Sequence, residues 1–247
     1  MTGISLILLP GLDGTGELFT PFIEHLPEHI HPIVVSYPRD KPYGYKELVP
    51  LVLSYLSKED SFLILGESFS GPLAVKIAHL NPKGLKGLIL CASFIKNPFR
   101  FLPSWLSVFS ISPIYYFWPA AIILRAPLSK NAEKDLIKRG LKAVKSVKPK
   151  VVAGRVKSIL KVNVEKELEG CKVPILYIKS EKDHLVKEHN LINIQSIKND
   201  VVVSEIDTKH FVLQLEPKRA VEEIVKFIKQ INSVNGVGAV QPFDNME

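Results

Sequence analysis

Short apolar runs alternate with polar connections along most of the chain. Six of these runs are rich in Val, Ile and Leu: Ile4–Leu9, Ile33–Ser36, Phe62–Leu65, Leu85–Cys91, Val173–Ile178 and Val201–Ile206. Several are almost continuously apolar, which is typical of parallel strands covered on both faces. The pattern therefore predicts a mostly parallel sheet.

Segments with helical spacing follow several of the predicted strands. They are Tyr45–Leu56, Phe69–His79, Leu185–Ser196 and Pro217–Ile231. In the last of them, Val221, Ile224, Val225 and Ile228 fall on one helix face. The alternation of strands and helices with short connections predicts an α/β fold, in which helices flank the sheet.

The alternation stops between residues 94 and 170, where no strand pattern occurs. This stretch begins with apolar residues and continues with basic ones, and we expect it to form a helical cap inserted over the sheet. The predicted organisation is a core of residues 1–93 and 171–231, a cap of residues 94–170 and a flexible tail of residues 232–247.

Composition narrows the class of protein. Of the 247 residues, 46% are hydrophobic and 23% are charged, which excludes a mainly disordered chain. Cys91 and Cys171 are too few for a disulfide scaffold and favour a reducing, cytoplasmic location. The first ten residues lack the basic start of a signal peptide and are interpreted as a strand.

One uncharged stretch, residues 101–124, is long enough to cross a bilayer. Pro103, Pro113 and Pro119 are spaced too closely within it for one continuous helix. We therefore disfavour a membrane span and interpret the stretch as apolar helical pieces that cover a pocket.

The strongest chemical motif follows the third predicted strand and reads Gly66-Glu-Ser68-Phe-Ser70-Gly71. A sharp strand-to-helix turn lifts a serine hydroxyl above the sheet edge and needs small residues on both sides. Gly66 and Ser70 meet that need, although glycine is the usual residue where Ser70 stands. The motif indicates a serine nucleophile; the alternative is an ordinary turn in which Ser68 caps the helix.

A serine nucleophile needs a base and an acid that orients the base. Asp183 follows the fifth predicted strand and His210 follows the sixth. Loops after parallel strands gather at the carboxyl edge of the sheet, where Ser68 is also expected. Glu181 and Asp207 are the alternative acids, since each lies within two residues of a suitable loop position.

Together these motifs resemble those of the α/β-hydrolase family over nearly the whole chain. The matching segments are Gly66-Glu-Ser68-Phe-Ser70, Glu181-Lys-Asp183-His184 and Lys209-His210-Phe211. The resemblance implies a serine esterase with Ser68 as nucleophile, His210 as general base and Asp183 as the orienting acid. It implies no metal and no cofactor.

The resemblance also implies an oxyanion hole made of two backbone N–H groups. One belongs to Phe69, the residue after the nucleophile, and we place the other at Leu12 in the loop after the first strand. Many family members have His-Gly where this chain has Pro10-Gly11.

Two competing ligand sites are disfavoured. Gly11, Gly14 and Gly16 resemble a nucleotide-binding turn, but the third glycine of that fingerprint falls at Phe19. Three histidines, His25, His29 and His31, suggest a metal cluster, but two prolines break their spacing and no cysteine or carboxylate joins them.

The expected cap has an aromatic half and a basic half. Trp105, Tyr116 and Trp118 in the first half are candidates to line a hydrophobic substrate pocket. Between residues 129 and 166, twelve Lys and Arg residues oppose three acidic ones, so the rest of the chain carries −2 of the total charge of +7. The simpler interpretation is that these basic residues form a solvated helical surface.

The alternative is a docking surface for an acidic acyl carrier protein. In plan, the chain is similar to family members that cleave pimeloyl–carrier methyl esters, which have a basic cap above a hydrophobic tunnel. Nucleic acid is disfavoured because the aromatic residues are separated from the basic ones.

The sequence thus predicts a capped serine hydrolase that cleaves small-molecule carboxylic esters with a hydrophobic acyl chain. A thioesterase or acyltransferase would use the same three residues. A receptor of the same fold that binds a hydrophobic ligand without turnover is the alternative from another class.

Overall fold

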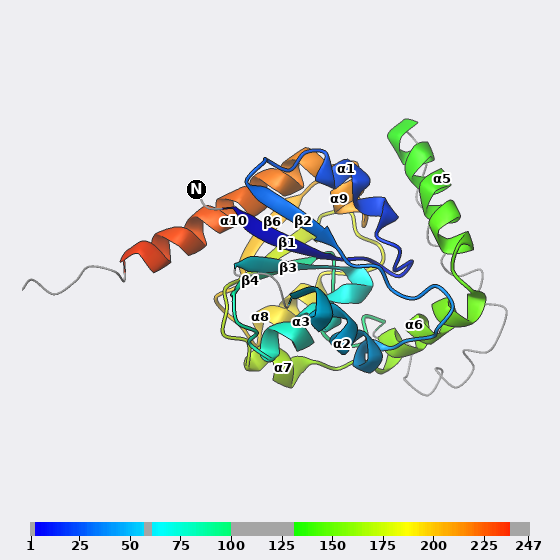
Figure 1. The fold of residues 1–247 in the computed structure, drawn as a ribbon, viewed down its shortest axis with the longest axis horizontal. Coiled ribbons are helices and arrows are strands. Elements are labelled where there is room, and N and C mark those ends of the chain that lie inside the picture. Colours follow the sequence, from blue (N-terminus) through cyan, green and yellow to red (C-terminus); the bar gives the residue numbers. More distant parts are fainter. Residues whose placement is uncertain (1–2, 57–60, 100–130, 238–247) are drawn as a thin grey trace, which may run out of the picture.

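The computed structural model describes residues 3–56, 61–99 and 131–237. Its centre is a six-stranded, wholly parallel sheet with the order β2-β1-β3-β4-β5-β6 (Figure 1). The strands are β1 (Ile4–Leu9), β2 (Ile30–Val34), β3 (Phe62–Glu67), β4 (Leu85–Cys91), β5 (Ile175–Ser180) and β6 (Val202–Ile206). The predicted parallel sheet is confirmed.

The largest error in strand placement concerns β2. The apolar pattern predicted Ile33–Ser36, whereas the strand covers Ile30–Val34. It lies at the edge of the sheet, and its middle residues His31 and Pro32 are exposed. An edge strand accommodates proline because one side of its backbone has no neighbouring strand. The polar residues at the centre of β2 interrupt the apolar pattern, and the prediction therefore missed the true bounds of the strand.

Two helical layers cover the two faces of the sheet (Figure 1). Helices α2 (Tyr45–Leu56), α3 (Gly71–His79) and α8 (His189–Gln195) pack with Ile7, Ile64 and Leu90 on one face. Helices α1 (Thr20–Ile23), α9 (Val212–Leu215) and α10 (Pro217–Val237) pack with Leu6 and Leu65 on the other. Consecutive strand residues are thus buried in opposite layers, which explains why the strands are apolar throughout.

The stretch predicted as a helical insertion is helical in its described part. It contains α5 (Asn131–Lys145), α6 (Pro149–Lys161) and α7 (Glu165–Glu169). Within residues 94–99 and 131–170, the only β pairing is an isolated bridge between Lys96 and Asn163. Helices α5 and α6 lie beside the carboxyl ends of the strands (Figure 1).

Two segment boundaries differ from the sequence-based expectation. The helix predicted from Leu185 begins at His189, because the Asp183 carboxylate binds the backbone N–H groups of Leu185 and Val186 and holds that segment as a loop. Helix α10 continues to Val237, so residues 232–237 are helical and not a loose tail.

Among the described helices, none is both long and apolar enough to cross a membrane. The uncharged stretch at residues 101–124 lies outside the described residues, and so do Trp105, Tyr116 and Trp118.

Candidate active site

The turn between β3 and α3 holds Ser68 in an uncommon backbone conformation. Its φ is 48°, in the left-handed region that non-glycine residues rarely adopt. A one-turn 3-10 helix, η2 (Ser68–Ser70), joins the strand to α3. A Cβ atom on Gly66 would collide with the Ser70 carbonyl, and one on Gly71 would collide with the Ser93 side chain. The turn therefore requires glycine at both positions.

Hydrogen bonds from neighbouring elements hold the backbone of this turn. The Ser93 hydroxyl, just after β4, donates to the Ser68 carbonyl at 2.6 Å. The Tyr45 hydroxyl, from α2, donates to the Phe69 carbonyl at 2.9 Å. Such bonds let the surrounding core maintain the strained φ of Ser68.

Ser68, His210 and Asp183 form one chain of hydrogen bonds at the carboxyl edge of the sheet. His210 Nε2 lies 2.9 Å from Ser68 Oγ, and His210 Nδ1 lies 2.8 Å from Asp183 Oδ2. With the proton on Nδ1, the imidazole donates to Asp183 and leaves Nε2 to accept the Ser68 hydroxyl proton. The side chains of His210 and Asp183 are 11% and 3% exposed, so little water competes for these bonds.

The alternative acids lie outside this arrangement. Asp207 pairs with Lys182, and its side chain is 55% exposed. Glu181 is also exposed. Asp183 alone among the three contacts the histidine, and two backbone N–H groups orient its other carboxylate oxygen.

Burial and charge act in opposite directions on this pair. Burial lowers the pKa of His210, but the charge and hydrogen bond of Asp183, together with the Glu67 charge, raise it above its ordinary value. Burial raises the pKa of Asp183, but the His210 charge and the hydrogen bonds from His210 and two amides bring it below its usual value. Asp183 is therefore ionised at neutral pH and stabilises a protonated His210.

Leu12, in the loop after β1, lines the same pocket as Ser68. Nearly every carbonyl oxygen of this loop is engaged: Ser70 Oγ donates to Pro10, and Gly14 N donates to Gly11 at 3.0 Å. Among the described residues, neither the Leu12 N–H nor the Phe69 N–H has a hydrogen-bond acceptor. Both expected oxyanion donors thus remain available.

Ser70 itself has a role that the motif did not reveal. Its hydroxyl accepts from the Tyr37 hydroxyl at 2.6 Å and donates to the Pro10 carbonyl. A glycine at this position could make neither bond. The departure from the usual motif therefore adds a direct link between the Ser68 turn and the loop after β1.

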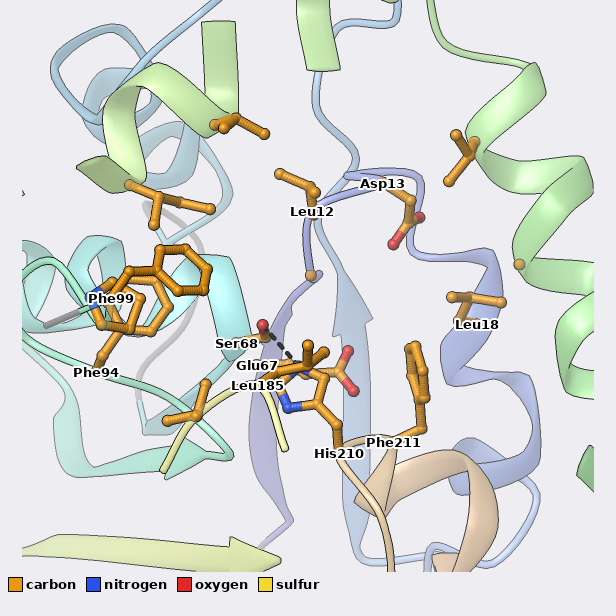
Figure 2. Close-up of a pocket in the computed structure, with 17 residues that line it drawn as sticks. Leu12, Asp13, Leu18, Glu67, Ser68, Phe94, Phe99, Leu185, His210 and Phe211 are labelled. Atoms are coloured by element: carbon orange, nitrogen blue, oxygen red, sulfur yellow. Dashed lines mark hydrogen bonds between the residues drawn. The ribbon is translucent and has the colours of Figure 1, made fainter. Parts of the chain in front are cut away.

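An apolar pocket of about 110 Å³ opens above Ser68 and His210 (Figure 2). Phe94 and Phe99 form one wall, and Leu12, Leu18 and Phe211 lie opposite them. The remaining described lining residues are Gly11, Asp13, Glu67, Pro98, Gly140, Val144, Val156, Ile159, Leu185 and Val186. Helices α5 and α6 thus contribute to the pocket through Gly140, Val144, Val156 and Ile159.

Glu67 was overlooked in the sequence although it lies inside the serine motif. It is buried, and Figure 2 shows its carboxylate beside the His210 ring. Burial raises the pKa of Glu67 to about 7, and the Asp13 charge acts in the same direction. The Gln214 hydrogen bond, the His210 charge and the hydrogen bond from the Gly11 N–H lower this pKa and oppose the effect of burial. An acidic residue next to Ser68, in a strand buried on both faces, was the available signal.

The basic surface requires one correction. Arg155 was counted with the exposed basic residues, but it is 1% exposed and contacts the loop after β1. Lys138, Lys142 and Lys145 in α5 are exposed as expected.

The competing ligand sites gain no support. Gly14 and Gly16 have φ values of 67° and 76°, and the Arg155 guanidinium group lies directly against Gly14. No group of three His, Cys, Asp or Glu side chains suited to a metal occurs within residues 3–56, 61–99 and 131–237.

Several solved structures superpose on nearly the whole chain. An enol-lactonase from Burkholderia xenovorans has a TM-score of 0.78 and 16% identity, covering 93% of this chain and 92% of its own. An esterase from Thermogutta terrifontis has a TM-score of 0.77 and 16% identity, covering 93% and 91%. An α/β hydrolase from a deep-sea metagenome of the Medee basin has a TM-score of 0.71 and 18% identity, covering 93% and 90%.

The chain therefore has the α/β-hydrolase fold, as its motifs indicated. No protein-family model matches the sequence, and no curated protein matches it. At these identities the superpositions establish the fold alone.

Proposed function

We propose that the chain is a serine hydrolase that cleaves carboxylic esters through an acyl-enzyme on Ser68. The observation that carries this proposal is the hydrogen-bonded series Ser68–His210–Asp183 at the floor of an apolar pocket. Hydrolysis by such a fold is also consistent with the lactonase and esterase among its structural neighbours.

The reaction begins when His210 Nε2 takes the Ser68 proton and Ser68 Oγ attacks the ester carbonyl carbon. The carbonyl oxygen becomes negative and accepts hydrogen bonds from the Leu12 and Phe69 N–H groups. The imidazolium, stabilised by ionised Asp183, returns its proton to the leaving alkoxide. His210 then activates a water molecule, which releases the acyl group and regenerates Ser68.

The apolar lining favours a hydrophobic acyl chain. Phe94, Phe99 and Leu18 offer no charged partner to a substrate, so contact with them favours the burial of apolar substrate surface. Asp13 and Glu67 are the acidic side chains that line the pocket, and they offer no cationic partner to an acyl group ending in a free carboxylate.

An active-site serine probe tests the proposal. A fluorophosphonate should label the native protein, and Ser68→Ala should abolish both labelling and ester hydrolysis. Ser196→Ala is the matched control, because Ser196 lies at the end of α8 and its hydroxyl only bonds a local carbonyl. Absence of labelling in the native protein would instead favour a non-catalytic receptor for a hydrophobic ligand.

A thioesterase or acyltransferase acting on carrier-linked chains is the second candidate. It is favoured by the exposed Lys138, Lys142 and Lys145 on α5, the helix whose Gly140 and Val144 line the pocket. An acidic acyl carrier protein docked there would deliver its acyl chain close to Ser68. Comparing p-nitrophenyl esters of increasing chain length with coenzyme A- and carrier-linked thioesters separates the two candidates.

A further inference from the structure

Arg155 differs from the other basic residues of α6. It is 1% exposed, whereas Lys150, Lys157 and Lys161 on the same helix are exposed. Burying a guanidinium group is unfavourable unless its N–H groups find acceptors. A buried arginine on an otherwise solvated helix therefore indicates a specific set of contacts.

Those contacts converge on the loop after β1. Arg155 Nη1 donates to the Leu12 carbonyl at 3.0 Å and to the Asp13 carbonyl at 2.6 Å, and Nη2 donates to the Pro38 carbonyl at 3.0 Å. The guanidinium carbon lies 5.5 Å from the centre of the Tyr37 ring, within the range of a cation–π contact. No carboxylate forms a salt bridge with Arg155 among the described residues.

Arg155 completes the restraint of this loop. The Pro10 carbonyl accepts from Ser70 and the Gly11 carbonyl accepts from Gly14 N, so Arg155 engages the two carbonyl oxygens that follow in the chain. Four consecutive peptide oxygens are therefore fixed in direction. The Leu12 N–H lies in the middle of this fixed segment and has no acceptor among the described residues.

We infer that Arg155 is a positioning residue for the oxyanion hole: it fixes the Leu12–Asp13 backbone so that the Leu12 N–H is oriented in advance toward the developing oxyanion. This inference rests on the proposed esterase function. It assigns helix α6, which lies in the inserted segment, a part in the chemical step as well as in pocket formation.

The inference predicts a particular kinetic signature. An oxyanion donor acts on the transition state far more than on the bound ester. Loss of its orientation should therefore lower kcat and leave KM nearly unchanged. Arg155→Met keeps an unbranched apolar stem but removes the guanidinium donors, and kcat should fall by about 10- to 100-fold. Arg155→Lys keeps one cationic donor group and should recover part of that loss.

Lys157→Met is the matched control, because it removes a charge from the same helix at an exposed position. Its kcat and KM should equal those of the native protein. Thermal unfolding of each variant shows how much of any loss reflects stability. Ser70→Ala provides a second variant if Arg155→Met does not fold. It removes the hydrogen bond to the Pro10 carbonyl, at the other end of the restrained segment, and should likewise lower kcat with little change in KM.

A boronic acid that forms a tetrahedral adduct with Ser68 gives a readout that stability alone does not alter. Its affinity should weaken with kcat across the Arg155 variants, while substrate KM stays constant. Unchanged kcat and boronic acid affinity in folded Arg155→Met would overturn the inference. A native protein that neither hydrolyses the esters nor binds the boronic acid would overturn the proposed function, and the inference with it.

Discussion

Gln214 Nε2 donates a hydrogen bond to Glu67 Oε1 at 2.9 Å and so joins the helix after His210 to the residue before Ser68. Both side chains are buried, and Gln214 Oε1 has no partner among the described residues. The Glu67 carboxylate also receives the Gly11 N–H. One acidic side chain therefore connects three segments of the site.

Glu67 makes stability depend on pH. In the unfolded chain its carboxyl group ionises near 4.5, whereas in the folded protein its pKa is about 7. The folded state therefore keeps a proton that the unfolded chain has released, and the free energy of unfolding falls as pH rises between these values. The shift corresponds to about 3 kcal/mol at pH 8.

Glu67→Gln removes this dependence, because an amide does not ionise. The variant also gives the orphaned Gln214 Oε1 a donor if the Gln214 amide turns over. The difference in Tm between Glu67→Gln and the native protein should become more favourable to the variant from pH 4.5 to pH 8. Thermal unfolding across this range measures it; a constant difference would mean that Glu67 is ionised throughout.

The same substitution should alter the pH dependence of catalysis. His210 must be neutral to accept the Ser68 proton, so kcat/KM falls as pH drops through the His210 pKa. The Glu67 charge contributes to raising that pKa. Glu67→Gln should therefore move the acidic limb of the kcat/KM profile to lower pH. A limb that stays in place, or moves to higher pH, would contradict the assigned interaction.

Asp183→Asn should reduce kcat by about 10³- to 10⁴-fold with the fold intact. The asparagine amide can face His210 with its N–H₂ group, which favours the tautomer that cannot accept the Ser68 proton. Asp207→Asn provides the matched control, since Asp207 lies in the adjacent loop, is exposed and pairs only with Lys182 among the described residues. Equal activity of both variants would show that Asp183 does not orient the base.

Charge reversal on α5 tests the docking surface. Replacing Lys138, Lys142 and Lys145 by Glu should lower kcat/KM for carrier-linked substrates by roughly tenfold, chiefly through KM, and weaken its dependence on salt. Activity on free p-nitrophenyl esters should not change. The control replaces Lys218, Arg219 and Lys229, which are exposed on α10. Equal effects of both triple variants would indicate non-specific electrostatics and reject a docking site on α5.

The sequence predicted most of the sheet because strands buried on both faces are recognisable without knowledge of their partners. The bounds of β1 and β4 agree with the apolar runs. It also identified Ser68, Asp183 and His210 as residues that would meet, since all three follow strands of one parallel sheet. The edge strand β2 was misplaced because its exposed face removes that signal.

The residues that support the site could not be found in this way. Tyr45, Ser93 and Arg155 come from elements far apart in the chain, and each acts through a backbone carbonyl that leaves no trace in the sequence. Arg155 is the sharpest example, because a run of Lys and Arg residues does not reveal which of them turns inward.

The hydrogen bonds from Arg155 to the Leu12 and Asp13 carbonyls have a consequence for the engineering of substrate range. Helices α5 and α6 contribute residues to the pocket, so this segment is a natural target for exchange when a new substrate range is wanted. Here an exchange that removes α6 would also withdraw the guanidinium group from the β1 loop. A chimera should therefore retain residues 149–161, or supply a new anchor for that loop, if its turnover is to survive.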